Sequence, residues 1–426
     1  MRWLALVLAA FALLIAPVAR AADKANPYDA RAQELLHVLS EKADPQPLFA
    51  PAFLAQISAE QVGAVARKLR EQNGTPERIE RITRNGEAAG TVHIGYPKAV
   101  VHIDMVLERD APHQIIGLLI ASITPRDDSQ ASLSADFSRL PGRSALIVVQ
   151  LDDPGARPLI ALEADRQVAI ASGFKLWLLA EASRQVRSGK RKWSDALPLA
   201  DRSLPSGITQ NWPRRAPITL HSAATLAISI SDNTAADTLL YALGRREVGA
   251  MVARAGHSQP VLPVLSTLET FALKMDSAAD LRAAWRMRDP ESRLALLNQS
   301  ALRLGMKAID DQQLAGKPRF IDEIEWFASP ADMARTLNWL RLNGDSEALA
   351  ILSVNKGIAR NDAARFHYIG YKGGSEIGVI AMHFLVQARN GKWYAVSGAW
   401  NNPAAGVDES RFVSLMNRAL SLIPNE

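Results

Sequence analysis

Three short motifs follow one another along the chain, and their order constrains the fold more than any other feature of the sequence. They are Ser172-Gly-Phe-Lys175, Ser231-Asp-Asn233 and Lys372-Gly-Gly374. Fifty-nine residues lead from Ser172 to Ser231, and a further 141 residues lead to Lys372. If the motifs act together, the fold must bring three remote segments of the chain to one place.

The order and spacing of the motifs resemble the active-site signature of class A β-lactamases and penicillin-binding proteins. The match extends over residues 225–240 around the second motif. One departure is Gly373, because the signature has Thr at the centre of its last motif. The resemblance implies an α+β fold for residues 126–426, with an antiparallel sheet flanked by helices and an all-helical subdomain. It also implies an enzyme that acylates its own serine.

Ser172 and Lys175 are predicted to lie on one face of a helix. An apolar run follows Lys175, so the helix begins at or just before Ser172, and residues three apart share a helix face. This places the Lys175 amine within hydrogen-bond reach of the Ser172 hydroxyl. Burial and the positive start of the helix both favour the neutral amine that a base requires. Taken alone, the motif has a simpler alternative, a serine N-cap followed by a surface lysine.

The resemblance implies a role for each of the other matched residues. Ser231 passes a proton to the leaving nitrogen, and Asn233 orients the lysine of the first motif and the substrate amide. Lys372 meets the substrate carboxylate. The backbone N–H groups of the nucleophile and of Ser375 form the oxyanion hole. The substrate-binding residues implied in this way are Asn233, Lys372, Gly374 and Ser375.

The resemblance also implies a glutamate that activates the deacylating water, and Glu269 lies 38 residues after Ser231. The family has an asparagine four residues beyond its glutamate, where this chain has Leu273. An equally supported alternative is that Glu269 closes a capping box begun by Ser266, in which case an acyl-enzyme would turn over slowly. The stretch from the glutamate to the last motif is 103 residues long, which predicts an insertion between positions 289 and 365.

The first 21 residues have the pattern of a secretory signal. Arg2 precedes an almost wholly apolar stretch at 3–18, and Ala19-Arg-Ala21 fits an A-x-A cleavage site. The chain has no cysteine, which excludes disulfides and thiolate metal sites. These features predict a periplasmic or secreted protein with no membrane span after cleavage. An anchored protein with an uncleaved signal is the alternative.

Residues 22–125 are predicted to form a separate α+β domain that has its helices first and its strands after them. The predicted helices span 30–39 and 58–71. The predicted strands span 78–83, 88–95, 99–107 and 113–123, with Asn85-Gly86 as a hairpin turn. This pattern resembles the cone-shaped domain of the nuclear-transport-factor-2 and steroid-isomerase type. The polar residues 126–130 mark the boundary to the second domain.

In the second domain, residues 126–426, the first and last segments are predicted to pair in one sheet. The predicted strands span 144–151, 159–163, 366–372, 378–387 and 392–399. A helix is predicted to start at Ser329-Pro330, and the terminal helix is predicted to start at Asp408.

Other classes of protein lack support in the sequence. None of the eight histidines forms His-x-His or His-Glu-x-x-His, so a zinc hydrolase has no ligands here. No Walker or Gly-x-Gly-x-x-Gly pattern occurs, and we predict neither a metal nor a cofactor. The net charge of +5 is spread over scattered Lys and Arg, which predicts no nucleic-acid partner.

The favoured hypothesis is a serine hydrolase that opens a β-lactam, or a related amide or ester, through an acyl-Ser172 intermediate. Its partner would be a small, carboxylate-bearing substrate. A D,D-peptidase or esterase is the first alternative, favoured by Gly373 and Leu273. A penicillin-binding sensor without turnover is the second, and the presence of all the matched Ser, Lys and Asn residues argues against it. The sequence does not predict the oligomeric state.

Overall fold

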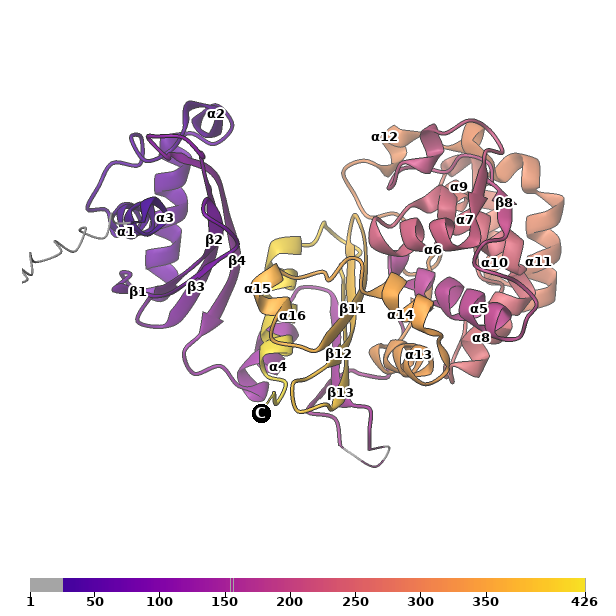
Figure 1. Ribbon diagram of the computed structural model, residues 1–426. Helices are drawn as coiled ribbons and strands as arrows, with labels where there is room; N and C mark the ends of the chain where they lie inside the picture. The colour runs from indigo at the N-terminus through magenta and orange to yellow at the C-terminus, as the bar shows by residue number, and fades with distance from the viewer. Residues whose placement is uncertain (1–25, 154, 156, 426) are drawn as a thin grey trace, which may run out of the picture.

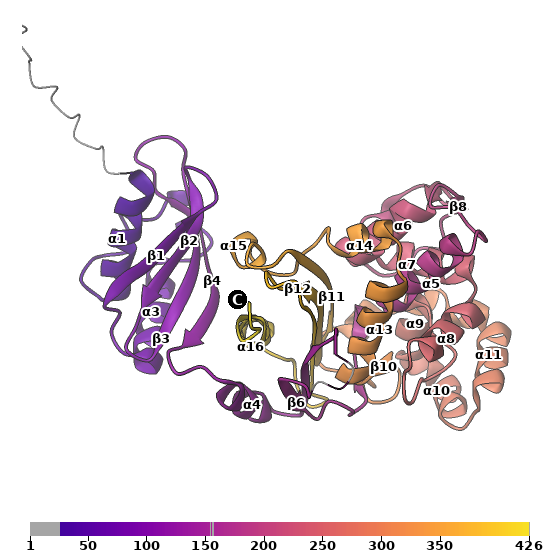
Figure 2. The ribbon, with the colours of Figure 1, turned by 60° about the horizontal axis from the view of Figure 1, so that its bottom comes forward.

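The computed structural model describes residues 26–153, 155 and 157–425. It shows a small α/β unit at one end, a five-stranded sheet in the middle and a helical region at the other end (Figure 1, Figure 2). The predicted signal segment 1–21 lies outside the described residues. Within the part of the chain that is described, no helix has the length and apolar character needed to cross a bilayer.

The first unit packs its helices against one face of an antiparallel four-stranded sheet (Figure 1). The helices are α1 (Pro27–Leu39), α2 (Pro51–Leu54) and α3 (Ala59–Asn73), and the strands, in spatial order, are β1 (Arg78–Arg84), β2 (Ala89–Gly95), β3 (Ala99–Leu107) and β4 (Ile115–Pro125). A capping box at Ser58 starts α3, and Gly74 ends it at a positive φ of 88°. The prediction of helices followed by strands is confirmed, and the likeness to the cone-shaped domain stays a prediction.

The middle sheet has five antiparallel strands in the order β11-β12-β13-β5-β6. Its strands are β5 (Arg143–Gln150), β6 (Ile160–Leu162), β11 (Tyr368–Glu376), β12 (Val379–Gln387) and β13 (Trp393–Asn401). The predicted pairing of first and last segments is therefore confirmed. One expectation was wrong: β11 does not end at Lys372 but continues to Glu376, so the Lys-Gly-Gly motif lies within the strand at the edge of the sheet.

Apolar side chains cover both faces of this sheet. On one face lie α4 (Gln130–Ser138) and α16 (Glu409–Ser421), whose Phe137 and Phe412 rings meet edge to face at 5.8 Å. Helix α16 also contacts β4 of the first unit, where the Ile123 N–H donates to Ser414 Oγ at 3.2 Å. This helix thus packs between the two sheets (Figure 2).

The other face packs against the helical region through a large apolar cluster. The helices of this region are α5 (Lys175–Arg187), α6 (Leu220–Ser229), α7 (Asn233–Leu243), α8 (Arg245–Arg254), α9 (Thr267–Leu273), α10 (Ala279–Arg286), α11 (Pro290–Gln299), α12 (Asp311–Leu314), α13 (Pro330–Asn343) and α14 (Ser346–Leu352); α15 (Arg360–Ala363) follows them. Two-stranded ribbons join β7 (Val168–Ala169) to β10 (Phe327–Ala328) and β8 (Ala196–Pro198) to β9 (Pro217–Thr219). The predicted start of α13 at Ser329 is confirmed by its capping box.

Candidate active site

A cleft of about 450 Å³ lies where the open edge of β11 meets the helical region. Six of the eight predicted site residues line it: Ser172, Ser231, Asn233, Lys372, Gly374 and Ser375. Lys175 is buried and hydrogen-bonds with two of these side chains. Glu269 is not among the described residues that line the cleft. The fold therefore brings the three remote motifs together.

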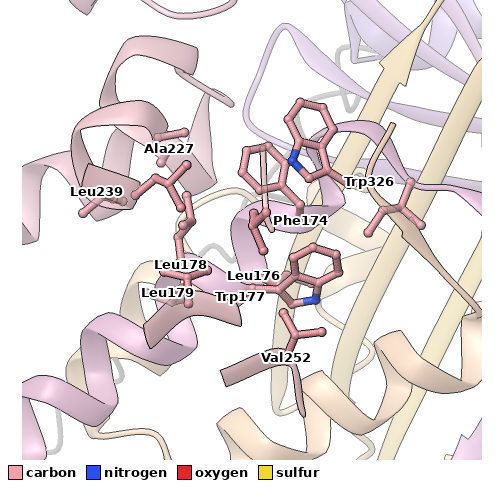
Figure 3. Packing of buried hydrophobic residues seen from close by; sticks show 14 of the residues in the cluster. Phe174, Leu176, Trp177, Leu178, Leu179, Ala227, Leu239, Val252 and Trp326 are labelled. Atoms are coloured by element: carbon pink, nitrogen blue, oxygen red, sulfur yellow. The ribbon is translucent and has the colours of Figure 1, made fainter. Parts of the chain in front are cut away.

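Ser172 lies in a tight 3₁₀ turn, η1 (Ala171–Phe174), which leads directly into α5. Ala171 has a φ of +43°, a left-handed conformation that costs energy for a residue with a Cβ and is typical of functional sites. The turn is anchored from the other side by Trp326, whose ring stacks on Phe174 with centroids 4.1 Å apart. Figure 3 shows these two rings lying against each other. Ser172 thus lies in a turn that leads directly into a helix, at the predicted helix start.

The Lys175 amine points toward the second motif. Its Nζ lies 2.6 Å from the Ser231 carbonyl oxygen, 2.7 Å from Asn233 Oδ1 and 3.1 Å from Ser231 Oγ. Among the described contacts, no hydrogen bond joins this Nζ to the Ser172 hydroxyl. Complete burial, and then the nearby positive charge of Lys372, hold the pKa of Lys175 well below its usual value.

The Ser231 hydroxyl bridges two lysines. Its Oγ lies 3.1 Å from Lys175 Nζ and 3.0 Å from Lys372 Nζ. Ser231 has a φ of +59°, and Ser206 holds it there by donating to its carbonyl oxygen at 2.5 Å. The backbone strain is again stored where the chemistry is expected. Lys175, Ser231, Asn233 and Lys372 are called the lysine cluster below.

Lys372 enters this cluster from β11 and has only 2% of its surface exposed. Burial lowers its pKa to about 7, because no carboxylate in the described part of the chain forms an ion pair with it. Its Nζ also donates to the Gly373 carbonyl oxygen. This amine therefore changes charge close to neutral pH.

Gly374 explains how closely the strand approaches the nucleophile. A Cβ at this position would lie 2.4 Å from the Ser172 backbone nitrogen and 2.6 Å from the Ile170 carbonyl oxygen. Only glycine leaves room for the edge of β11 to pass beside the Ser172 N–H. The backbone N–H groups of Ser172 and of the following Ser375 are thus on adjacent segments, as an oxyanion hole requires.

The departure at Gly373 also has a steric cause. A Cβ there would lie 2.0 Å from the Tyr371 hydroxyl oxygen, so this tyrosine fills the space that a threonine side chain would need. Tyr371 lines the cleft, and burial raises the pKa of its hydroxyl to about 12. A neutral hydroxyl donor is therefore present beside the motif, although it comes from a different residue than the signature suggests. The sequence offered no signal for this exchange.

Glu269 is the predicted site residue that the structure places elsewhere. Its carboxylate accepts two hydrogen bonds from Arg245, both at 2.8 Å, and closes the capping box with the Ser266 N–H at 2.8 Å. The capping-box alternative is confirmed. Helix α9 follows its N-cap Ser266, and its residues that line the cleft are Thr267 and Phe271, not Glu269.

Three charged residues that the sequence analysis missed lie at the cleft instead. Lys274 Nζ binds Glu325 Oε1 and Glu376 Oε1, both at 2.5 Å, and both glutamates line the cleft. Burial and the neighbouring Glu376 raise the pKa of Glu325 well above its usual value, against the opposing effect of Lys274. Burial by itself would lower the pKa of Lys274, but the two carboxylates have the larger, opposite effect. The pKa of Lys274 is therefore raised, and the lysine stays charged. These residues form the carboxylate cluster.

Two other polar residues near the motifs have structural roles. Asp232 caps α7 and accepts hydrogen bonds from the backbone N–H groups of Ile208 and Thr209. His383 lies 2.6 Å from where a Gly173 Cβ would be, and burial and Lys372 lower its pKa to about 3.

Among the described residues, no group of three or more His, Cys, Asp or Glu side chains could hold a metal ion.

The fold and the cleft define a protein of the serine β-lactamase and penicillin-binding-protein class. The model of the β-lactamase enzyme family matches residues 128–361, and the chain belongs to that family. No curated protein matches the sequence.

Several solved structures are similar to this chain. A β-lactamase from Sphaerobacter thermophilus has 22% identity over 69% of this chain and 98% of its own, with a TM-score of 0.49. A penicillin-G acyl-enzyme complex of a PBP-A variant has 17% identity over 68% of this chain and 94% of its own, with a TM-score of 0.46. An ancestral class A β-lactamase has 19% identity over 68% of this chain and 98% of its own, with a TM-score of 0.49.

Proposed function

We propose that the protein is a serine hydrolase that opens a β-lactam, or a related amide or ester, through an acyl-Ser172 intermediate. One observation carries this proposal: in the cleft that Ser172 lines, the Ser231 hydroxyl lies within 3.1 Å of two buried lysine amines. Such an arrangement favours proton transfer, because burial lowers the pKa of Lys175 well below its usual value and that of Lys372 to about 7.

In the first step, Ser172 Oγ attacks the substrate carbonyl and Lys175 accepts its proton. The low pKa of Lys175 leaves a free electron pair on the amine for this purpose. Hydrogen bonds between a base and its nucleophile often tighten only when substrate is bound. The proton then reaches the leaving nitrogen through Ser231, whose hydroxyl already contacts Lys175.

The developing oxyanion is stabilised by the backbone N–H groups of Ser172 and Ser375. Support comes from Gly374, which brings the strand carrying Ser375 against the Ser172 nitrogen. Each such donor typically contributes about 3 to 4 kcal/mol to the stability of the transition state.

The substrate is a small molecule with a carboxylate. Below about pH 7, the charged Lys372 amine attracts this group at the part of the cleft that Ser231 lines. The Tyr371 hydroxyl supplies the second donor that the missing threonine would have given. The predicted export signal at residues 1–21 supports action in the periplasm or outside the cell.

The test is the intact mass of the purified protein over time after mixing with a penicillin and with a cephalosporin. We expect a covalent adduct of the mass of the antibiotic on the wild-type protein and none on Ser172→Ala. A Ser172→Ala protein that still forms the adduct would exclude Ser172 as the nucleophile. No adduct with either compound would reject β-lactams as substrates.

A further inference from the structure

A hydrolase of this kind needs a second step, in which water attacks the acyl-serine, and that step needs a base at the cleft. Glu269 does not line the cleft, and its carboxylate is bound by Arg245 and the Ser266 backbone N–H. The carboxylates of the described residues that do line the cleft are those of Glu325, Glu376 and Glu409.

Glu325 is tied directly to the turn that carries the nucleophile. The next residue, Trp326, accepts a hydrogen bond from the Ile170 N–H at 2.9 Å and stacks on Phe174. After it, β10 pairs with β7, the strand that leads into the same turn. Because contacts on both sides of Ser172 hold this segment, the position of Glu325 relative to Ser172 is rigid.

Glu376 approaches the same place from the strand on the other side. It lies two residues after Gly374 on β11, and side chains two apart in a strand share a face. On that face, Gly374 lies against the Ser172 backbone nitrogen and the Glu376 side chain binds the Lys274 amine. The carboxylate cluster therefore lies on the same side of β11 as Ser172.

Glu325 is also the more deeply buried of the two carboxylates. Its side chain is 1% exposed, against 18% for Glu376, and both share one lysine. One ammonium can balance only one of the two negative charges. Burial therefore favours a state in which Glu325 and Glu376 together retain one proton. Burial also raises the pKa of Glu325 well above its usual value, and once it has lost its proton such a carboxylate is a stronger base than an ordinary surface glutamate. Glu409 reaches the cleft from α16 on the opposite face of the sheet.

We infer that Glu325 is the general base that activates the deacylating water, and this inference rests on the proposed function. Glu325 takes one proton from a water molecule while the water oxygen bonds to the acyl carbon of the Ser172 ester. The bond between that carbon and Ser172 Oγ then breaks, and Oγ receives the proton back. The products are the free serine and a carboxylic acid, and the only co-reactant is water.

The experiment follows acylation and deacylation separately for wild type, Glu325→Gln and Glu269→Gln. Stopped-flow mixing with a chromogenic cephalosporin gives the rate of adduct formation, and intact mass gives its lifetime. We expect Glu325→Gln to form the adduct within about threefold of the wild-type rate and to lose it at least 100-fold more slowly. Glu269→Gln is expected to keep both rates, since its carboxylate pairs with Arg245.

The outcomes separate the two proposals. Equal adduct lifetimes in wild type and Glu325→Gln would overturn the inference and leave the acyl-Ser172 proposal standing. A longer lifetime in Glu269→Gln alone, or a wild-type adduct that never decays, would also overturn it. No adduct on wild type would reject β-lactams as substrates and, with them, the inference.

A purely structural role for Glu325 has a different signature. If Glu325→Gln folds poorly, Glu325→Asp keeps the charge beside Lys274 and moves the carboxylate by about one methylene. Thermal unfolding of each variant is measured beside the kinetics. We expect Glu325→Asp to slow deacylation with acylation unchanged. A fall of both rates in parallel with lost folded protein would overturn the assignment.

Discussion

The lysine cluster and the carboxylate cluster lie at one cleft, yet the pKa values of their buried lysines are shifted in opposite directions. In the first, Lys175 and Lys372 are buried without a carboxylate partner among the described residues, and the pKa of each falls. In the second, Lys274 is equally buried but bonds to two carboxylates, and its pKa rises. Burial alone thus does not decide whether a lysine is charged; its counter-ions do.

This difference assigns different tasks to the two sides of the cleft. A neutral or easily neutralised amine can accept and return protons, as the formation of an acyl-serine requires. A permanent ammonium holds carboxylates in place and allows one of them to act on water. The lysine cluster is therefore suited to acylation and the carboxylate cluster to deacylation.

The largest expected effect comes from removing the Lys175 amine from the lysine cluster. Lys175→Met keeps the apolar stem but has no group to take the proton of Ser172. We expect the rate of adduct formation to fall by about 1,000-fold or more, a range typical for loss of a general base. Stopped-flow acylation measures the effect, with thermal unfolding as the control for folding. Acylation within tenfold of wild type would contradict the role of Lys175.

Removing the lysine of the carboxylate cluster should act on stability instead. Lys274→Met leaves Glu325 and Glu376 buried without a counter-ion, and breaking a buried ion pair in this way costs about 3 to 5 kcal/mol. Urea unfolding measures the free energy. The matched control is Lys274→Met combined with Glu325→Gln, which should recover part of the loss. A change below 1 kcal/mol in the single variant would show that the cluster is not charged as described.

The close approach of the two sides depends on Gly374. In Gly374→Ala the new Cβ would lie 2.4 Å from the Ser172 nitrogen, so the strand or the turn must shift. We expect about 1 to 3 kcal/mol of destabilisation, as is usual for overpacking, together with slower acylation. The control is Gly406→Ala, where no atom lies within 4 Å of the added Cβ and the backbone φ is not positive. Equal acylation in the two variants would contradict the proposed oxyanion hole.

The smallest expected effect is on pH dependence. Burial lowers the pKa of Lys372 from its usual 10.5 to about 7, so the amine is charged below pH 7 and neutral above it. Attraction for a substrate carboxylate is present at low pH and lost as the pH rises. We expect kcat/KM for a penicillin to fall about tenfold per pH unit above pH 7. An uncharged ester is the control, and an identical fall for both substrates would contradict this role of Lys372.

Local features of the sequence predicted much of the fold. The strands β2, β3, β12 and β13, the hairpin turn at Asn85-Gly86 and the helix start at Ser329 were all found from patterns within a few residues. The same is true of Ser172 and Lys175, because a spacing of three in a helix nearly determines their relation. Their precise contacts were not found, since the Lys175 amine turns toward Ser231 and Asn233.

Glu269 shows how a local signal and a family pattern can compete. The spacing from Ser231 favoured a catalytic glutamate, whereas Ser266 favoured a helix cap. The cap prevailed because Ser266 and Glu269 are neighbours in the first turn of α9, and Arg245 completes the binding of the carboxylate. Arg245 lies 24 residues from Glu269 in the sequence, and no sequence pattern predicted this contact.

The sequence by itself determined the three motifs, most of the strands and the helix that follows Ser172. It did so because these depend on spacing, capping and alternation, which act between near neighbours. Only the tertiary structure decided which charges meet: Glu325 is 153 residues from Ser172, and no motif marks it. It reaches the cleft because Trp326 and β10 pack against the turn of the nucleophile. Packing of remote segments sets burial and counter-ions, and these decide the chemistry of each buried group.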